Sequence, residues 1–358
     1  MSLSFTYTAL PSHVLFGPGS FDRVPEEVER LGHERVLVLA TPRVADLVAR
    51  ARGLLGGRVV GVFEGATMHT PVAVSERALA TLREVAADCV LAIGGGSATG
   101  LAKALAARTD VDQVVVPTTY SGSEVTPVLG ETEDGVKTTR SSPALLPESV
   151  VYDVELSVDM PAGLAVCSAV NAMAHAVEAF YSADANPVTD AVAARALPAL
   201  SEGVRAIAEG RRDLESAGKL LLGAWLAGSC LGAVRMGLHH KLCHTLGGSF
   251  DLPHAQTHTV MLPHALAYNA GHAPEAVGQI AAALGAEDPP GAVYDLTRSA
   301  AGPTSLRDLG LAEADLDRAA ELAVASPYPN PAPLDRDRIR QLLDDAWRGS
   351  RPSLLVRR

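Results

Sequence analysis

The chain has 358 residues and a formal charge of −11, with 30 Lys and Arg against 41 Asp and Glu. This acidic balance argues against nucleic acid and anionic membranes as main partners. A hydrophobic content of 47% with 20% charged residues is typical of a globular protein, and a chain of this length is expected to form two domains.

The first part of the chain alternates short apolar runs with helical patterns. Strands are predicted at the apolar runs 35–40, 58–63, 89–97, 113–119 and 149–153. Helical spacing follows several of them, as in VSERALATLREVAA (74–87). This rhythm predicts a parallel sheet with helices on both faces. Residues 129–140, around the pair Asp134-Gly135, predict a small hairpin.

The pattern changes after Pro161, where strand signals nearly vanish and helices rich in Ala and Leu dominate. We therefore predict an α/β domain at 1–160 and an all-helical domain at 161–358. A cleft between two domains is an expected ligand site. The longest apolar runs are interrupted well short of about 18 residues, so no transmembrane helix is expected.

The four cysteines are widely spaced and form no CxxC pair. The N-terminal residues show no signal-peptide pattern. We therefore expect reduced thiols and a cytoplasmic protein.

A glycine-rich loop, GGGSATG (94–100), follows a predicted strand and opens a predicted helix. Bare glycines let the backbone approach a phosphate, and a helix N-terminus supplies N–H groups and a positive dipole end. The spacing is not that of the GxGxxG fingerprint, and a purely structural turn is the alternative. A second polar loop, PTTYSGSE (117–124), follows the next strand and favours the phosphate interpretation.

Five of the eleven histidines fall within residues 237–258. Helical spacing of i, i+4 pairs Asn171 with His175, His240 with His244, and His254 with His258. Any one of these histidines alone could be a surface or core residue. Three such pairs favour a common site.

Together these motifs resemble the iron-containing alcohol dehydrogenase family, from FGPGS (16–20) to LPHALAYN (262–269). The resemblance implies a Rossmann-like dinucleotide-binding α/β domain followed by an all-α domain, the dehydroquinate synthase-like architecture. The segments at 94–103, 117–124, 171–181 and 237–269 are similar to the maleylacetate reductase branch. Members of that branch reduce maleylacetate to 3-oxoadipate with NADH or NADPH, late in the degradation of aromatic compounds such as resorcinol and hydroxyquinol.

The resemblance also implies a metal-ligand set, at Asn171, His175, His240 and His254. Metal-dependent members carry Asp at the first of these positions, where this chain has Asn171. A neutral amide is a poorer ligand for a divalent ion than a carboxylate. We therefore expect no metal to be required. If one binds, His175, His240 and His254 with Asn171 would hold it.

The motifs further imply a set of cofactor contacts. Gly94, Gly95, Gly96 and Ser97 are expected at the pyrophosphate, and Thr118, Thr119 and Ser123 beside the nicotinamide. Thr41 is expected at the adenosine ribose, where NAD-selective relatives often carry an acid. With Arg43 nearby and no acid, a 2′-phosphate would be tolerated, which predicts use of both NADH and NADPH.

Catalysis without metal is chemically reasonable for an enone substrate, because hydride addition at the carbon β to the ketone produces an enolate that hydrogen-bond donors can stabilise. His175, His240, His244 and His254 are the expected donors and acids. His244 is the favoured proton donor, with His240 and His254 as rivals. Several imidazoles together would also attract the substrate carboxylates. The other candidate carboxylate partners are Lys241, His239, Lys137 and Arg140, each of which could equally be a solvated charge.

Three alternatives remain. The first is a zinc- or iron-dependent alcohol dehydrogenase of the same family. The second is a dehydroquinate synthase-like cyclase, which the scarcity of lysine disfavours. The third is a non-enzymatic binding protein. A small dicarboxylate substrate, a homodimer, and no nucleic-acid or membrane partner are the expected associations.

Overall fold

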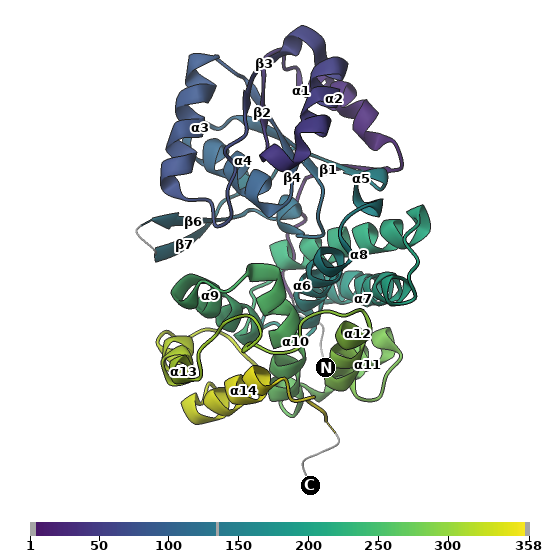
Figure 1. The fold of residues 1–358 in the computed structure, drawn as a ribbon, viewed down its shortest axis with the longest axis vertical. Coiled ribbons are helices and arrows are strands. Elements are labelled where there is room, and N and C mark those ends of the chain that lie inside the picture. Colours follow the sequence, from purple (N-terminus) through teal and green to yellow (C-terminus); the bar gives the residue numbers. More distant parts are fainter. Residues whose placement is uncertain (1–4, 134–135, 355–358) are drawn as a thin grey trace. The chain divides into compact units, whose positions relative to one another are not determined.

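The computed structural model describes residues 5–133 and 136–354. The chain divides into two compact units (Figure 1). Among the described residues, 9–133 and 136–159 form an α/β unit, and 160–354 together with 5–8 form a helical unit. The α/β and all-helical architectures predicted from the sequence are confirmed.

The α/β unit is built on a six-stranded sheet in which every neighbouring pair is parallel, in the order β1-β8-β5-β4-β2-β3. Its strands are β1 (His13–Gly17), β2 (Val36–Leu39), β3 (Val59–Phe63), β4 (Cys89–Gly94), β5 (Asp112–Pro117) and β8 (Ser149–Asp153). The central strands β2, β4 and β5 are almost wholly buried, which explains their continuous apolar runs. Sequence patterns missed β1, a partly exposed five-residue edge strand.

Helices cover both faces of this sheet (Figure 1). On one face α1 (Val24–Leu31) and α2 (Ala45–Leu55) pack against side chains such as Val38 and Ile93. On the other, α3 (Val72–Glu84) and α4 (Gly96–Thr109) pack against side chains such as Leu39 and Val90.

The chain runs from β2 to β3 at one edge, then returns to the opposite side of β2 to form β4. The strand order therefore reverses between β2 and β4. Ligands of open parallel sheets bind outside the carboxyl ends of the strands at such a reversal.

A separate two-stranded hairpin, β6 (Val128–Glu133) and β7 (Val136–Ser141), forms where the sequence predicted one. The Asp134-Gly135 turn lies outside the described residues, as does the side chain of Lys137.

In the helical unit, no strand occurs among the described residues. Its helices are α6 (Ala162–Phe180), α7 (Pro187–Ala208), α8 (Leu214–Ala233), α9 (Leu238–Phe250), α10 (His254–Ala270), α11 (Pro274–Leu284), α12 (Pro289–Ser299), α13 (Leu316–Val324) and α14 (Arg336–Arg348). Capping residues explain where several of these helices begin. Asn186 and Asp213 form capping boxes at α7 and α8, and prolines occupy the first turns of α7, α11 and α12.

Helix α6 is the central helix of this unit and packs against α7, α8 and α10. Every residue from Ala165 to Phe180 is buried. Within the described residues, α6 is long and apolar enough to cross a membrane, and so is the α8–α9 pair, which is bent by 96°. Because 89% of the apolar stretch of α6 is buried inside the protein, its place in the core accounts for this composition.

Candidate active site

The glycine-rich loop joins β4 to α4 as the sequence predicted. Strand β4 ends at Gly94, α4 begins at Gly96, and Gly95 is the N-cap. Gly94 has a φ of 148°, a conformation that favours glycine. A Cβ placed on Gly95 would lie 2.8 Å from Oγ1 of Thr119. The bare backbone at this helix N-terminus is therefore a suitable cradle for a phosphate.

The second loop, 117–124, is tied to the first by the backbone N–H of Thr118, which donates to the carbonyl of Gly94 at 2.9 Å. Thr118, Thr119 and Ser123 are all half-buried. The hydroxyl of Ser121 donates to Glu124 at 3.0 Å, and the hydroxyl of Tyr152 donates to the other carboxylate oxygen at 2.9 Å.

Lys103 supports this loop from inside the unit. Its Nζ donates to the carbonyls of Ser123, Thr126 and Val128 at 2.5, 2.7 and 2.9 Å. Burial lowers the pKa of Lys103 to about 7, while the nearby Glu124 acts in the opposite direction. Sequence reasoning did not identify Lys103 or Glu124, although Lys103 lies in the segment 94–103 and Glu124 in the loop 117–124.

Thr41 lies just after β2, and the glycine loop follows β4, so the two occupy the carboxyl ends of adjacent strands. Thr41 is half-buried and Arg43 is exposed. Both loops and Thr41 thus belong to the sheet edge where the strand order reverses, which suits an extended dinucleotide.

A histidine cluster gathers residues from three helices of the helical unit. His175 comes from α6, His240 and His244 from α9, and His254 from α10. The ring centroids of His175 and His240 are 5.2 Å apart, and those of His240 and His244 are 6.1 Å apart. His258, which the sequence analysis assigned no role, links the cluster, with its ring 5.1 Å from His240 and 4.4 Å from His254.

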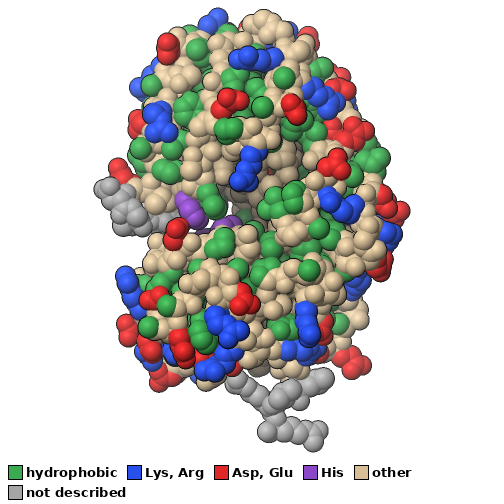
Figure 2. Space-filling model, in the orientation of Figure 1, with side chains coloured by type: hydrophobic (Ala, Val, Ile, Leu, Met, Phe, Trp, Pro, Cys, Tyr) green, Lys and Arg blue, Asp and Glu red, His purple; other side chains and the backbone are tan. Residues whose placement is uncertain are grey.

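The cluster runs from the interior to the surface. His239 and His258 are completely buried, and His175 and His240 are 3% and 6% exposed. His254 is half-buried and His244 is exposed. Histidine side chains are visible in the space-filling view (Figure 2).

Burial determines the charge of the inner imidazoles. It lowers the pKa of His175, His239 and His258 well below the usual range, and the neighbouring histidines lower it further. These three rings are neutral at pH 7. The expected attraction between the histidine cluster and the substrate carboxylates stays a prediction, in which these three rings would act as hydrogen-bond donors and not as cations. Neutral rings can still donate hydrogen bonds.

The candidate carboxylate partners differ in their surroundings. His239 is fully buried and its Nε2 lies 2.9 Å from Nδ1 of His258, so it is not placed to contact a substrate carboxylate. That prediction is corrected, because His239 points into the core rather than to the surface. Lys241 is half-buried. Arg140 is exposed on β7 and donates to Glu131 at 2.9 Å.

Glu178 is a residue that sequence reasoning missed. Its side chain is fully buried on α6, and one carboxylate oxygen lies 2.6 Å from Nδ1 of His240. The signal was available, since Glu178 follows His175 by three residues and so shares its helix face.

The predicted metal-ligand set meets one requirement for holding an ion and lacks another. Asn171 Oδ1, His175 Nδ1 and His240 Nε2 are buried and have no hydrogen-bond partner, so they are available as ligands. All of these side chains are neutral metal ligands, however, and the set contains no carboxylate that would balance the charge of a divalent ion. The fit is that of a weak site.

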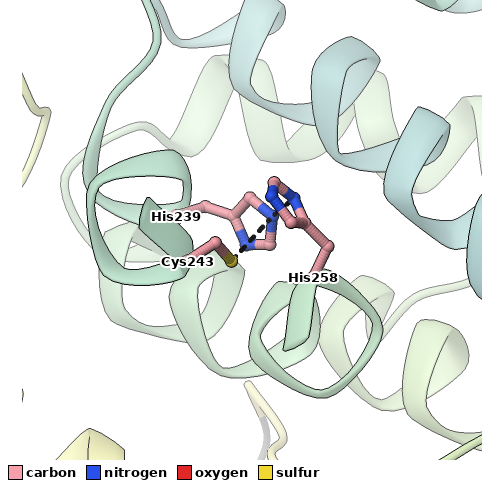
Figure 3. A group of neighbouring side chains, drawn as sticks. All are labelled: His239, Cys243 and His258. Carbon is pink, nitrogen blue, oxygen red and sulfur yellow. Dashed lines mark hydrogen bonds between the residues drawn. The ribbon is translucent and has the colours of Figure 1, made fainter. Parts of the chain in front are cut away.

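A different group has convergent ligand atoms. Among the described residues, the group of three or more Asp, Glu, His and Cys side chains whose ligand atoms all lie within 4.8 Å of one another is His239, Cys243 and His258 (Figure 3). Burial and the charge of Glu178 raise the pKa of Cys243, which keeps its thiol protonated. Since the two imidazoles already share a hydrogen bond, this triad is better explained as core packing.

Comparison with known proteins identifies the family. The model described as "Iron-containing alcohol dehydrogenase" matches residues 11–154, and "Fe-containing alcohol dehydrogenase family, C-terminal" matches residues 165–347. The chain therefore belongs to the iron-containing alcohol dehydrogenase family, whose members are oxidoreductases.

Within the family, the chain groups with the maleylacetate reductase branch. It is 56% identical to Maleylacetate reductase 1 of Rhodococcus opacus over 351 residues, which cover 98% of both chains. It is 49% identical to the maleylacetate reductase of Rhizobium sp. strain MTP-10005, over 97% of this chain and 99% of that one. The crystal structure of maleylacetate reductase from Agrobacterium tumefaciens matches with a TM-score of 0.94 and 48% identity, covering 98% of this chain and all of that one.

Proposed function

We propose that this chain reduces the conjugated carbon–carbon double bond of maleylacetate to give 3-oxoadipate, with NADH or NADPH as hydride donor. The observation that carries the proposal is the 56% identity, over nearly the whole chain, to a maleylacetate reductase. Its role would lie in the degradation of aromatic compounds such as resorcinol and hydroxyquinol. We further propose a cytoplasmic homodimer.

The α/β unit supplies the cofactor site in this proposal. Backbone N–H groups at the start of α4, beside Gly94, Gly95, Gly96 and Ser97, bind the pyrophosphate. Thr118, Thr119 and Ser123 line the nicotinamide side, and Thr41 meets the ribose. When bound, the nicotinamide supplies the hydride. The expectation that cofactor and substrate meet at the junction of the two domains stays a prediction.

The substrate determines what the histidines must do. Maleylacetate has a double bond conjugated to a ketone, so hydride addition at the carbon β to the ketone moves negative charge onto the ketone oxygen. The neutral imidazole of His175 stabilises that enolate as a hydrogen-bond donor. A proton added at the α carbon completes the reduction.

We assign the proton delivery to His244, with His240 and His254 as the competing candidates. The exposure of His244 supports this assignment, because an exposed imidazole can recover its proton from solvent. Lys241, on the same helix and half-buried, is the proposed partner of a substrate carboxylate.

Metal removal is the first experiment. We expect the chelator-treated, metal-analysed protein to oxidise NADH with maleylacetate at the rate of the untreated protein, because the donor set contains no carboxylate ligand. Cofactor absorbance gives the rate and elemental analysis gives the metal content. Zinc and iron added back separately are the controls.

The same experiment tests the second candidate, a zinc- or iron-dependent alcohol dehydrogenase. The unpaired Asn171 Oδ1, His175 Nδ1 and His240 Nε2 favour it. With His254, these residues would hold the ion, which would polarise a substrate oxygen. Activity that disappears with the metal and returns with zinc or iron would support this candidate. A metal-replete protein that leaves maleylacetate untouched but oxidises simple alcohols would establish it.

Cofactor choice gives a further prediction. We expect NADH and NADPH to be used with kcat/KM values within about 100-fold of each other, because Thr41 places no charge against a 2′-phosphate. Thr41→Asp should lower kcat/KM for NADPH by about tenfold or more and spare NADH, since a like-charge contact costs binding free energy. Initial rates with both cofactors measure this. An unchanged cofactor ratio in Thr41→Asp would show that residue 41 does not meet the ribose.

A further inference from the structure

The N-terminus of α9 has no side-chain cap of its own. Its N-cap is Gly237, and the helix begins at Leu238. The first hydrogen bond along the helix is donated by Lys241 to the carbonyl of Gly237 at 3.1 Å. The N–H groups of Gly237, Leu238, His239 and His240 therefore need acceptors from elsewhere.

Two side chains from other parts of the helical unit provide them. Glu178 accepts from the N–H groups of Gly237 at 3.0 Å, His239 at 2.9 Å and His240 at 3.4 Å. The amide oxygen of Asn330 accepts from Leu238 at 3.2 Å. A Cβ on Gly237 would lie 3.2 Å from Glu178 and 3.0 Å from Asn330, so glycine permits this close approach.

Glu178 also binds the side chain of His240. The distance from its Oε2 to Nδ1 of His240 is 2.6 Å. A carboxylate surrounded by backbone donors can only accept, so the ring donates and its proton lies on Nδ1. Nε2 of His240 is buried and has no hydrogen-bond partner. This ring nitrogen is the one left for a ligand.

We propose that Glu178 is a positioning residue, which orients the ring of His240 and fixes its proton on Nδ1, so that Nε2 carries the lone pair. The negative charge of Glu178 at the N-terminus of α9 also favours this arrangement through the helix dipole. The same carboxylate thus caps the N-terminus of α9, the helix that carries His239, His240 and His244. It also selects one tautomer of His240.

The tautomer determines what His240 can do. With the proton on Nδ1, the neutral ring presents an acceptor at Nε2, which can bind an ion or take up a proton, and which can deliver a proton only after it has taken one up. A ring held by no carboxylate could carry its proton on either nitrogen. The significance for maleylacetate reduction rests on the proposed function, whereas the tautomer itself can be measured independently.

The test is Glu178→Gln, which keeps the shape and removes the charge. A glutamine amide presents one oxygen and one NH₂ group. It therefore cannot accept from all four donors that Glu178 binds, which are the N–H groups of Gly237, His239 and His240 and the ring Nδ1–H of His240. We expect kcat for maleylacetate to fall by about 10- to 100-fold, with KM for NADH unchanged. Ring-nitrogen NMR of protein labelled with ¹⁵N-histidine should show the Nδ1–H form of His240 in the wild type and its loss in Glu178→Gln. The spectrum of His240→Ala assigns the signal.

Asn330→Ala is the matched control, because Asn330 caps the same helix end and does not touch the His240 ring. It should lower Tm and leave both kcat and the tautomer unchanged. Glu178→Asp should restore part of the activity and the Nδ1–H form. The proposal is wrong if Glu178→Gln retains the Nδ1–H tautomer of His240. It is also wrong if kcat falls in proportion to the loss in Tm in both Glu178→Gln and Asn330→Ala. Failure of the wild type to reduce maleylacetate would count against the proposed function alone, since the NMR result would still stand.

Discussion

Replacing His240 with alanine is expected to lower kcat for maleylacetate by about 10²- to 10⁴-fold, the contribution typical of a positioned acid–base group. His240 lies between His175 and His244, and its unpaired Nε2 is the one that Glu178 leaves available. Removing this ring also leaves the buried carboxylate of Glu178 without one of its donors. Steady-state rates with maleylacetate and NADH measure the effect.

His264→Ala is the matched control for this experiment. His264 is another buried imidazole with an unpartnered Nε2, and burial lowers its pKa to about 4. It stands on α10 beyond His254 and His258, and is not among the rings in contact within the cluster. Its removal should reduce stability and leave kcat near the wild-type value. Full activity in both His240→Ala and His254→Ala would contradict the cluster as the catalytic centre.

Replacing Gly95 with alanine is expected to raise KM for NADH by about 10- to 100-fold, equivalent to losing one charge-assisted hydrogen bond of about 1.5–3 kcal/mol. The new Cβ would lie 2.8 Å from Oγ1 and 2.9 Å from Cγ2 of Thr119. Real Cβ atoms do not approach so closely, so the Thr119 side chain, the glycine-rich loop or the second loop must shift. Both loops are proposed cofactor contacts. KM for NADH and its Kd by fluorescence titration measure the loss.

Gly53→Ala is the control in the same unit. Gly53 lies in α2, and a Cβ there would meet no atom within 4 Å. Alanine should stabilise the helix by roughly 0.5–1 kcal/mol and leave KM for NADH unchanged. An unaltered Kd for NADH in Gly95→Ala would mean that the glycine loop serves the turn and not the cofactor.

Much of the α/β unit could be predicted because its signals are local. The central strands are buried on both faces and therefore read as unbroken apolar runs. The glycines of 94–96 mark the change from strand to helix. Strand β1 escaped prediction because its stability comes from pairing with β8, more than 130 residues away in sequence. Pairing with so distant a strand leaves no recognisable pattern in the five residues of β1 themselves.

The histidines that share a helix face could be predicted from their i, i+4 spacing, because helix geometry places such residues on one side. The same spacing does not show which face of a helix points inward. His239 and His240 are neighbours in sequence, yet His239 points to His258 and Cys243 while His240 points to Glu178. This difference arises from the packing of α6, α9 and α10, because burial depends on what covers a helix face. The same packing makes the inner imidazoles neutral and gives α9 a cap from another helix.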